Sequence, residues 1–437
     1  MSHDTNSRWP GFFKLSIHER ISQLAQRAGL EEADLRYLSQ SEHLPRRTAN
    51  HMIENCIGTF ELPLGLAMNL RVDGVDRLVP MAIEEPSVLA GLSKAARYLR
   101  QGPGISTSAT VPLMIGQVQL LDVPDLDQAK QRVLAAKQEL LDTSNDLDPK
   151  LVAMGGGARD LEVRILPPEG RDDPVGTMFV IHLIVDVRDA MGANAVNTMA
   201  ERLAPRLEDL TGGRARLRIL SNLADRRLVV ARGHVPVTSL GSNGAPNAGA
   251  DIAQGVMEAS VFAERDPYRA ATHNKGIMNG IDAVLIALGQ DWRAVESGAH
   301  SFAARSGRYR ALSRWRVREG VLHGELELPL AVGTVGGIIE SHPAVRAGFA
   351  ILDIRSAAGL ASIAAAVGLA QNLAALCALA TVGIQHGHMR LHARKVGLSL
   401  GAAEEELGPL TEELQRRGRA DVETAAAVLA ELRGSRG

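Results

Sequence analysis

Cysteine is scarce in this sequence, and neither sign of charge is in excess. Only two of the 437 residues are cysteines, Cys56 and Cys377, and they lie far apart without the spacing of a metal or redox motif. Both are interpreted as reduced, buried side chains of a cytoplasmic protein. Because 48 Lys and Arg oppose 50 Asp and Glu, the net charge of -2 gives no basic field that would attract nucleic acid or anionic lipid. The composition favours a small-molecule substrate.

A secretory signal is not expected, because the first residues contain no apolar core followed by a cleavage site. The region 356–389 contains no Asp, Glu, Lys or Arg and is long enough to raise the question of a membrane span. It consists mostly of Ala and Gly and includes Gln371 and Asn372, so it is only weakly hydrophobic. A helix buried inside a large protein or at a subunit interface is the preferred interpretation.

The middle of the chain shows a hydrophobic period that alternates between two residues and about 3.6 residues. The elements expected there are a strand at 114–121, a helix at 126–140, strands at 161–165 and 178–187, a helix at 194–210 and a strand through 217–219. This β-α-β-β-α-β order is typical of a ferredoxin-like unit. Residues 113–221 are therefore predicted to form a small inserted domain.

The two flanks of this unit, residues 1–112 and 222–382, are predicted to fold together as one large helix-rich domain. The first flank contains one strand-like run, from Arg77 to Ile83. Beyond residue 383 the composition becomes charged and amphipathic, which predicts a small C-terminal helical appendage over 383–437. The expected fold class is α+β.

A Rossmann dinucleotide motif, G-x-G-x-x-G opening a helix, is missing. Gly155 to Gly157 precede a strand, so they are interpreted as a turn. The better candidate for a pyrophosphate site is Asp189 to Asn194, which connects an apolar strand to a helix N-terminus with free N–H groups. An ordinary strand-to-helix turn is the alternative.

Two adjacent carboxylates, Glu84 and Glu85, end the apolar run that begins at Val79. A carboxylate that faces an apolar site has a raised pKa and can deliver a proton near neutral pH. A solvated strand end is the competing interpretation.

The segment from Asp266 to Gly280 brings cations and amides together in what is interpreted as a Gly-bounded loop. Such a loop is suited to gripping a carboxylate and polarising a carbonyl oxygen. Asp291 follows after one helix length and could return to pair with Lys275. Surface salt bridges are the alternative.

Three histidines, His386, His388 and His392, lie close together near the C-terminus. Their spacing permits metal ligation from one helix face, but no further Cys or carboxylate cluster completes a ligand set, so no metal is expected. A hinge-borne acid is the alternative, because histidine titrates near neutrality and can protonate a leaving thiolate.

Taken together, these segments resemble the class II (bacterial-type) hydroxymethylglutaryl-CoA reductases over nearly the whole chain. Glu54 to Pro63 is similar to the family's E-N-x-x-G-x-x-x-x-P signature. Asp189 to Asn194 is similar to its D-A-M-G-x-N cofactor motif, and Gly333 to Gly337 to its glycine-rich motif.

The resemblance implies an enzyme that interconverts (R)-mevalonate, CoA and two NAD with 3-hydroxy-3-methylglutaryl-CoA and two NADH. The implied catalytic residues are Glu85 as acid, Lys275 as oxyanion-stabilising cation, Asp291 as the group that tunes both, and His388 as the proton donor to the CoA thiolate. The implied substrate contacts are Ser87, Arg269 and Asn279. In some relatives an arginine touches CoA where this chain has Phe12 to Lys14, so Lys14 is a candidate phosphate contact.

The resemblance also implies that the small domain holds the cofactor and that Asp189, Met191, Gly192 and Asn194 contact it. The ribose position falls on Asp148, whose carboxylate would accept a hydrogen bond from the 2′-hydroxyl of NAD and repel the 2′-phosphate of NADP. This favours NAD and the oxidative, mevalonate-degrading direction, although Lys150 lies close by.

Two alternatives stay open, an NADP-dependent biosynthetic reductase and a redox-silent CoA-thioester-binding protein. The family implies a dimer with the active site between subunits, and the C-terminal appendage is expected to close over that site as a flap.

Overall fold

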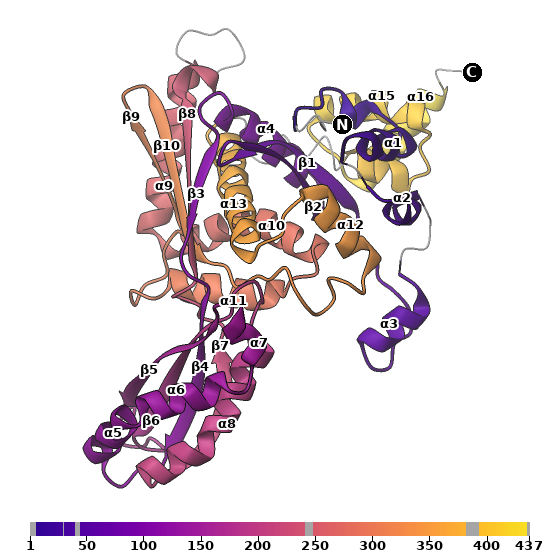
Figure 1. Cartoon of the computed structure of the whole chain (residues 1–437). Helices are drawn as coiled ribbons and strands as arrows, with labels where there is room; N and C mark the ends of the chain where they lie inside the picture. Colours follow the sequence, from indigo (N-terminus) through magenta and orange to yellow (C-terminus); the bar gives the residue numbers. More distant parts are fainter. Residues whose placement is uncertain (1–5, 29, 40–43, 241–247, 382–392, 435–437) are drawn as a thin grey trace.

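The computed structural model describes residues 6–28, 30–39, 44–240, 248–381 and 393–434. Its architecture is α+β, as predicted, with two separate β-sheets and helices packed on each. Figure 1 shows the small sheet and its helices extending away from the larger body that contains the other sheet.

The large sheet has six strands in the order β2-β1-β3-β8-β10-β9. They are β1 (Leu64–Val72), β2 (Val75–Ala82), β3 (Ile105–Ala109), β8 (Leu228–Pro236), β9 (Ser313–Arg318) and β10 (Val321–Pro329). The expectation of a single strand before residue 113 is therefore wrong, since three strands lie there. Short strands that bury one face carry polar residues on the other, which weakens their hydrophobic signal.

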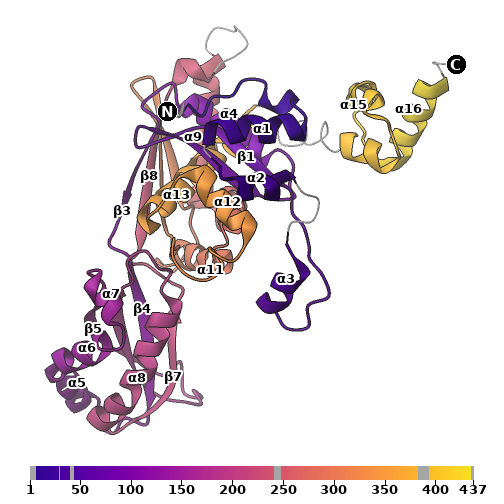
Figure 2. The ribbon, with the colours of Figure 1, turned by 45° about the vertical axis from the view of Figure 1, so that its right-hand side comes forward.

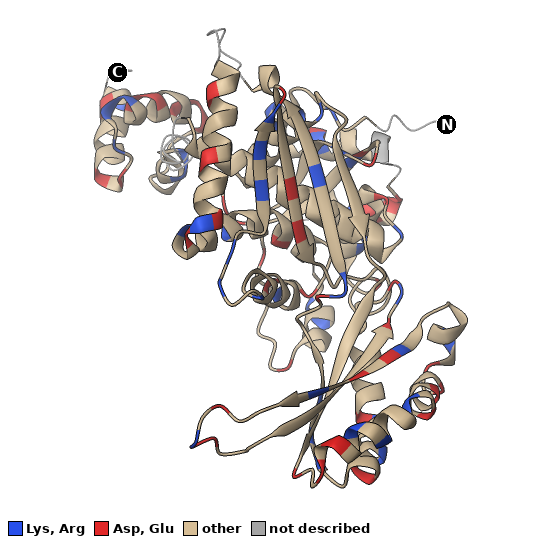
Figure 3. Ribbon diagram, turned by 90° about the vertical axis from the view of Figure 1, so that its left-hand side faces the viewer, with Lys and Arg blue, Asp and Glu red and all other residues tan. Residues whose placement is uncertain are grey.

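One face of the large sheet is polar, and Figure 3 shows charged residues along its strands. Arg232 on β8 donates to Glu325 on β10 across the ladder, at 2.8 Å. Arg316 on β9 donates to Glu264 with both terminal nitrogens. The charged face explains why these strands do not form continuous apolar runs.

Among the described residues, six helices pack closely on strands of the large sheet. They are α4 (Val88–Leu99), α9 (Ala248–Arg265), α10 (Pro267–Ala287), α11 (Trp292–Ala303), α12 (Pro343–Leu352) and α13 (Ala357–Leu379). α13 is long and apolar enough to cross a membrane, but 78% of its most apolar window is buried within the chain. It contributes to the main hydrophobic core, as expected for this charge-free region.

Glycines let α10 and α13 approach each other closely. A Cβ at Gly280 of α10 would lie 2.9 Å from the Cβ of Gln371. A Cβ at Gly368 of α13 would lie 2.8 Å from Ile281 Cδ1. Because side chains are excluded at this crossing, α10 is held at a fixed distance from the core helix.

The small sheet has the order β5-β6-β4-β7, and all its strands pair antiparallel. Its elements are β4 (Leu113–Leu121), α5 (Leu126–Ala135), α6 (Lys137–Asn145), α7 (Pro149–Ala153), β5 (Gly157–Leu166), β6 (Met178–Asp186), α8 (Ala193–Thr211) and β7 (Arg214–Ser221). The ferredoxin-like order is confirmed, with the first predicted helix divided at Ala136. The proposed domain limits themselves stay a prediction.

The small sheet is inserted between two neighbouring strands of the large sheet. β3 and β8 pair antiparallel, with Ala109 opposite Val229. Thr110 donates its N–H to Leu228 O, and Leu228 N–H donates to Thr110 Oγ1, both at 2.9 Å. The two connections to the inserted part therefore run side by side.

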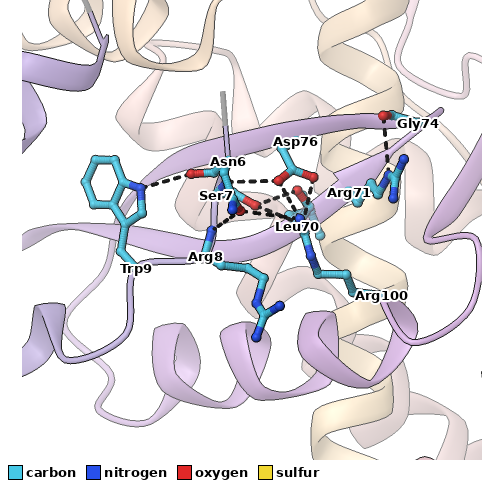
Figure 4. Close-up of polar contacts among 9 residues, drawn as sticks. All are labelled: Asn6, Ser7, Arg8, Trp9, Leu70, Arg71, Gly74, Asp76 and Arg100. Carbon is cyan, nitrogen blue, oxygen red and sulfur yellow. Dashed lines mark hydrogen bonds and ion pairs between the residues drawn. The ribbon is translucent and has the colours of Figure 1, made fainter. Parts of the chain in front are cut away.

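The N-terminal segment is fastened to the large sheet, and Figure 4 shows the contacts. Arg100, just after α4, donates two hydrogen bonds of 2.7 and 2.6 Å to the carboxylate of Asp76 on β2. Ser7 N–H donates to the same carboxylate at 3.0 Å, and Ser7 Oγ donates to Leu70 O. The helices that follow are η1 (Phe12–Lys14), α1 (Ile17–Ala28), α2 (Glu32–Ser39) and α3 (Arg46–Met52).

The described C-terminal part contains α15 (Glu404–Arg417) and α16 (Val422–Gly434). These helices share a separate small core that includes Leu410 and Val428. Ion pairs between Arg433 and Glu406 and between Arg417 and Glu431 join them. In Figure 2 this unit stands apart from the rest of the chain.

Candidate active site

The segment from Asp266 to Gly280 is helical, so the expectation of a Gly-bounded loop is wrong. Asp266 caps α10 by accepting the N–H of Arg269 at 3.0 Å, and Pro267 occupies the first helical position. The glycine at 280 permits the close crossing with α13 and does not end the helix. As a result, Lys275 and Asn279 lie four residues apart on one helix face.

Lys275 and Asn279 both reach Glu85, which lies in the bend after β2. Lys275 Nζ donates to Glu85 Oε2 at 2.9 Å, and Asn279 Nδ2 donates to the same oxygen at 3.3 Å. The structure therefore unites three residues that come from two distant motifs. The Lys275 side chain is 61% exposed in the single chain, so these described residues alone do not form a water-poor cavity.

Ser87 lies two residues beyond Glu85, at the N-cap of α4. Its φ is 75°, which places a non-glycine residue in the left-handed region, and its side chain does not cap the helix. A strained backbone of this kind costs about 1–3 kcal/mol and is commonly retained at functional sites. The hydroxyl is thus available for a substrate contact.

Arg269 lies in the first turn of α10 and is half-buried. Burial lowers the pKa of its guanidinium from the usual value. Among the described residues, its guanidinium makes no hydrogen bond or ion pair. An unpaired cation on the helix that carries Lys275 is suited to binding a carboxylate.

Asp291 lies at the N-cap of α11, and the structure does not bring it to Lys275. Its Oδ1 accepts the N–H of Ala294 at 3.1 Å and lies 3.4 Å from a guanidinium nitrogen of Arg293. Both of these contacts use Oδ1, and no contact joins either carboxylate oxygen to Lys275 among the described residues.

Two predicted contacts lie away from this cluster or cannot be placed. Lys14 is exposed in η1, with Nζ 5.9 Å from the ring centroid of the exposed Phe13. His388, with His386 and His392, lies outside the described residues. Among the residues that are described, no group of three His, Cys, Asp or Glu side chains could hold a metal ion.

The segment from Asp189 to Asn194 connects β6 to α8, as predicted. The Asp189 carboxylate accepts the N–H of Ala357 at 2.8 Å, and its carbonyl accepts the N–H of Thr334 at 2.8 Å. A Cβ at Gly333 would lie 2.6 Å from Met191 N. The two glycine-containing motifs are therefore in direct contact.

Gly192 is the N-cap of α8 and has a φ of 100°. A Cβ there would lie 2.5 Å from Val187 Cγ1, so only glycine fits without displacement. No side chain caps α8, and Asn194 is exposed in its first turn. Free N–H groups at an uncapped helix N-terminus fit an anionic phosphate group.

Sequence reasoning missed two residues that support this segment. Arg227 is buried and donates to the carbonyls of Ala190 and Met191 at 3.2 and 3.3 Å. Burial lowers the pKa of Arg227 to about 10, although nearby carboxylates oppose this. Gln290 Oε1 accepts the N–H of Gly333 at 2.8 Å. Gln290 immediately precedes the predicted residue Asp291 in the chain, whereas nothing in the sequence singled out Arg227.

Asp148 lies at the N-cap of the short helix α7. Its Oδ1 accepts the N–H of Leu151 at 3.0 Å, which fixes the direction of the carboxylate. Gly155 and Gly157 follow α7 with positive φ and lead into β5, so the predicted turn is confirmed.

Comparison with known proteins gives consistent matches. The family model described as hydroxymethylglutaryl-coenzyme A reductase matches residues 16–393. A 3-hydroxy-3-methylglutaryl-coenzyme A reductase of Archaeoglobus fulgidus is 48% identical over 429 residues, which cover 98% of this chain and 95% of that protein.

Solved structures agree with this match. The Streptococcus pneumoniae enzyme of the same name is 42% identical, with a TM-score of 0.82 over 97% of this chain and 100% of that one. Another structure from that organism, described as the class II enzyme bound to NADPH in open conformations, is 42% identical. Its TM-score is 0.81 over 86% of this chain and 100% of that one.

Proposed function

This chain belongs to the hydroxymethylglutaryl-CoA reductase family of oxidoreductases, and we propose that it works as an NAD-dependent enzyme in the oxidative direction. The proposed reaction converts (R)-mevalonate, CoA and two NAD into 3-hydroxy-3-methylglutaryl-CoA and two NADH. The contact of Lys275 and Asn279 with Glu85 supports the reductase chemistry, because it brings a cation, an amide and a carboxyl group together. The choice of NAD and of the oxidative direction rests on Asp148.

Lys275 is proposed to stabilise the negative charge that develops on the substrate oxygen. A fixed cation at such an oxygen is worth most where water is excluded. Glu85, within hydrogen-bond distance of Lys275, is proposed to move the proton to and from that oxygen. Asp291 is proposed to adjust the pKa values of both groups through its negative charge.

Substrate recognition is assigned to three residues near this cluster. Arg269 offers its unpaired cation to the substrate carboxylate, and Asn279 and Ser87 offer neutral polar groups. Lys14 stays a proposed contact for CoA phosphate. His388 is proposed to exchange a proton with the CoA sulfur, and residues 383–437 to close over the site as a flap.

The unit 113–221 is proposed to hold the cofactor, which accepts or supplies the hydride when bound. The uncapped N-terminus of α8 and Gly192 fit the pyrophosphate, with Asp189, Met191 and Asn194 around it. Asp148 is proposed to accept a hydrogen bond from the ribose 2′-hydroxyl, which would disfavour a 2′-phosphate.

A specific observation supports the competing cofactor. A structure 42% identical to this chain is described as bound to NADPH, and Lys150 lies two residues from Asp148. An NADP-dependent enzyme acting in the biosynthetic direction is therefore the second candidate.

We also propose a cytoplasmic dimer whose subunits complete one another's active sites. The exposure of Lys275 in the single chain supports this, because electrostatic stabilisation by a lysine needs a dry site. α3 and the segment after it expose Ile53, Ile57 and Phe60, as expected for a surface covered by a second chain.

The deciding experiment follows near-ultraviolet absorbance after mevalonate and CoA are mixed with the enzyme and either NAD or NADP. Faster formation of NADH supports the proposal, whereas faster formation of NADPH supports the second candidate. A protein that binds CoA thioesters but gives no absorbance change with either cofactor, in either direction, would be the redox-silent alternative.

A further inference from the structure

A line of polar side chains joins α10, α11 and the chain that follows α11. Its members, which we call the polar seam, are Asp282, Glu296, His300, Tyr309 and Asn274. Asp282 and Glu296 share a side-chain hydrogen bond, and His300 Nε2 lies 2.6 Å from Glu296 Oε2. His300 Nδ1 lies 2.6 Å from the Tyr309 hydroxyl, which accepts from Asn274 Nδ2 at 3.0 Å.

The contact between Asp282 and Glu296 requires a proton. Two ionised carboxylates can only accept hydrogen bonds, so a bond between them exists only when one carboxyl is protonated. Like charges at this distance also repel, which favours a single shared proton. The pair therefore carries one negative charge, not two.

The surroundings place this proton on Asp282. Asp282 Oδ1 is buried and has no hydrogen-bond partner among the described residues, which is less costly for a neutral acid than for a carboxylate. Glu296, in contrast, faces the donor His300. Burial, reinforced by Glu296, raises the pKa of Asp282 well above its usual range, and the hydrogen bond from His300 lowers that of Glu296.

Several charged groups on the elements around the polar seam are paired elsewhere, and the unpaired Arg269 lies in the first turn of α10. α10 and α11 also pack against β2, α4, α9, α12, α13 and β10. The charged pairs on or beside these elements are Arg77 with Asp353, Glu264 with Arg316, Arg346 with Asp34, Arg232 with Glu325, and Arg305 with Glu327. None of these pairs contacts Asp282, Glu296 or His300 within the described part of the chain. The protonation state of Asp282 and Glu296 therefore depends mainly on residues of the polar seam.

The polar seam connects the two helices that carry the proposed chemistry. Lys275, Asn279 and Asp282 follow one another at spacings of four and three residues, so they share a face of α10. α11, which carries Glu296 and His300, begins directly after Asp291. A shift between these helices would change the separation of Lys275 and Asp291.

We propose that Asp282, Glu296 and His300 are positioning residues that fix α10 against α11, with Asp282 acting as a neutral proton donor to Glu296. The inference rests on the proposed roles of Lys275 and Asp291. It adds three residues that do not touch the substrate. They act by fixing the position of α10, which carries the proposed substrate contacts.

Matched amide substitutions test where the proton lies. In D282N the amide N–H₂ replaces the acid O–H as donor, so kcat is expected to stay within about twofold of wild type. E296Q removes the charge that His300 and Asp282 face and allows Asp282 to ionise. Misplacement of the reacting groups then lowers kcat by about 10- to 100-fold, with a smaller change in KM for mevalonate. The reverse order of the two variants, or equal effects, would overturn the proposal.

A second measurement needs no catalytic activity and remains informative if E296Q does not fold. A group whose folded pKa is raised contributes stability below its unfolded pKa and loses it as pH rises through the folded value. Wild type is therefore expected to lose thermal stability relative to D282N as pH rises from about 5 to about 8. A difference in Tm that does not change with pH would contradict a neutral Asp282.

The two readouts separate this inference from the proposed function. If wild type lacked the reductase reaction, the proposed function would fail while the pH dependence of the Tm difference still reported on Asp282. If wild type were active and D282N were strongly impaired, the inference about the polar seam would be wrong while the proposed function would stand.

Discussion

Lys275 Nζ and Glu85 Oε2 lie 2.9 Å apart although 190 residues separate them in the chain. The bond joins the bend after β2 to the middle of α10. Because α10 is itself fixed against α13 by Gly280, the position of the cation depends on the packing of the main core. The proposed chemistry is thus a property of the assembled large sheet and its helices.

Lys275→Ala is expected to lower kcat at least about 100- to 1000-fold, since a preorganised charge at the developing oxyanion is lost. Calorimetric titration with hydroxymethylglutaryl-CoA should show that binding largely survives. Lys130→Ala, an exposed lysine on α5, is the control and should behave as wild type. Retained turnover in the Lys275 variant would exclude the proposed role.

Gly192→Ala is expected to weaken cofactor binding and to destabilise the fold by about 1–3 kcal/mol, because the new Cβ meets Val187 at the N-terminus of α8. KM for the cofactor and chemical denaturation provide the two readouts. Gly155→Ala is a matched control, since Gly155 also has positive φ but open space around its Cβ position. If both variants lost cofactor affinity equally, the steric argument would be wrong.

Arg227→Lys is expected to raise the KM for the cofactor more than it lowers kcat. Lysine cannot span the carbonyls of Ala190 and Met191 with a planar group, so the segment proposed to bind the cofactor loses support. Stability should fall by about 1–3 kcal/mol, as for a buried group that loses partners. Arg226→Lys, at the neighbouring residue that pairs with Glu162 on the surface, should change neither quantity.

Asp76→Asn is expected to destabilise the protein at neutral pH by loosening the N-terminal segment. Burial acts to raise the pKa of Asp76, but hydrogen bonds from Arg100 and Ser7 outweigh it and hold the pKa below its usual value. A lowered folded pKa gives stability that is present above the unfolded pKa and is lost as pH falls through the folded one.

Denaturation of wild type and D76N as a function of pH measures this contribution. The stability difference should be constant from about pH 5 to about pH 8 and should shrink as the pH approaches about 3. Asp122→Asn removes an exposed pair with Arg214 and should cost at most about 1 kcal/mol. A difference for D76N that persisted in acid would point to lost packing and not to the ion pair.

The small sheet could be predicted from the sequence because each of its elements has a clear hydrophobic period and ends at a distinct signal. Gly212, which ends α8 with a φ of 69°, is one such signal. The large sheet was mostly missed, because β3 and β8 bury one face and carry polar residues on the other. Their pairing joins residues more than a hundred positions apart in the chain. A local hydrophobic pattern cannot predict such a pairing.

The candidate site shows the same limit. The motifs named Glu85 and Lys275 separately, but only the packed structure shows that they meet. Glycines at 276 and 280 suggested a loop, whereas the contact of Gly280 with α13 requires a helix that can approach closely. Arg227 was not predicted, because its partners are backbone carbonyl groups. The sequence does not show where the folded chain places those groups.

The adjacency of β3 and β8 makes the entire region 111–227 equivalent to the turn of a β-hairpin. A hairpin tolerates exchange of its turn as long as the strand pairing beside the turn is kept. Here the two hydrogen bonds between Thr110 and Leu228 mark the end of that pairing. The large sheet consequently has no topological need for the inserted unit. We expect that a chain in which a two-residue Asn-Gly turn replaces residues 111–227 keeps the strand pairings of the large sheet, although it loses the contacts of Asp189 with Thr334 and Ala357.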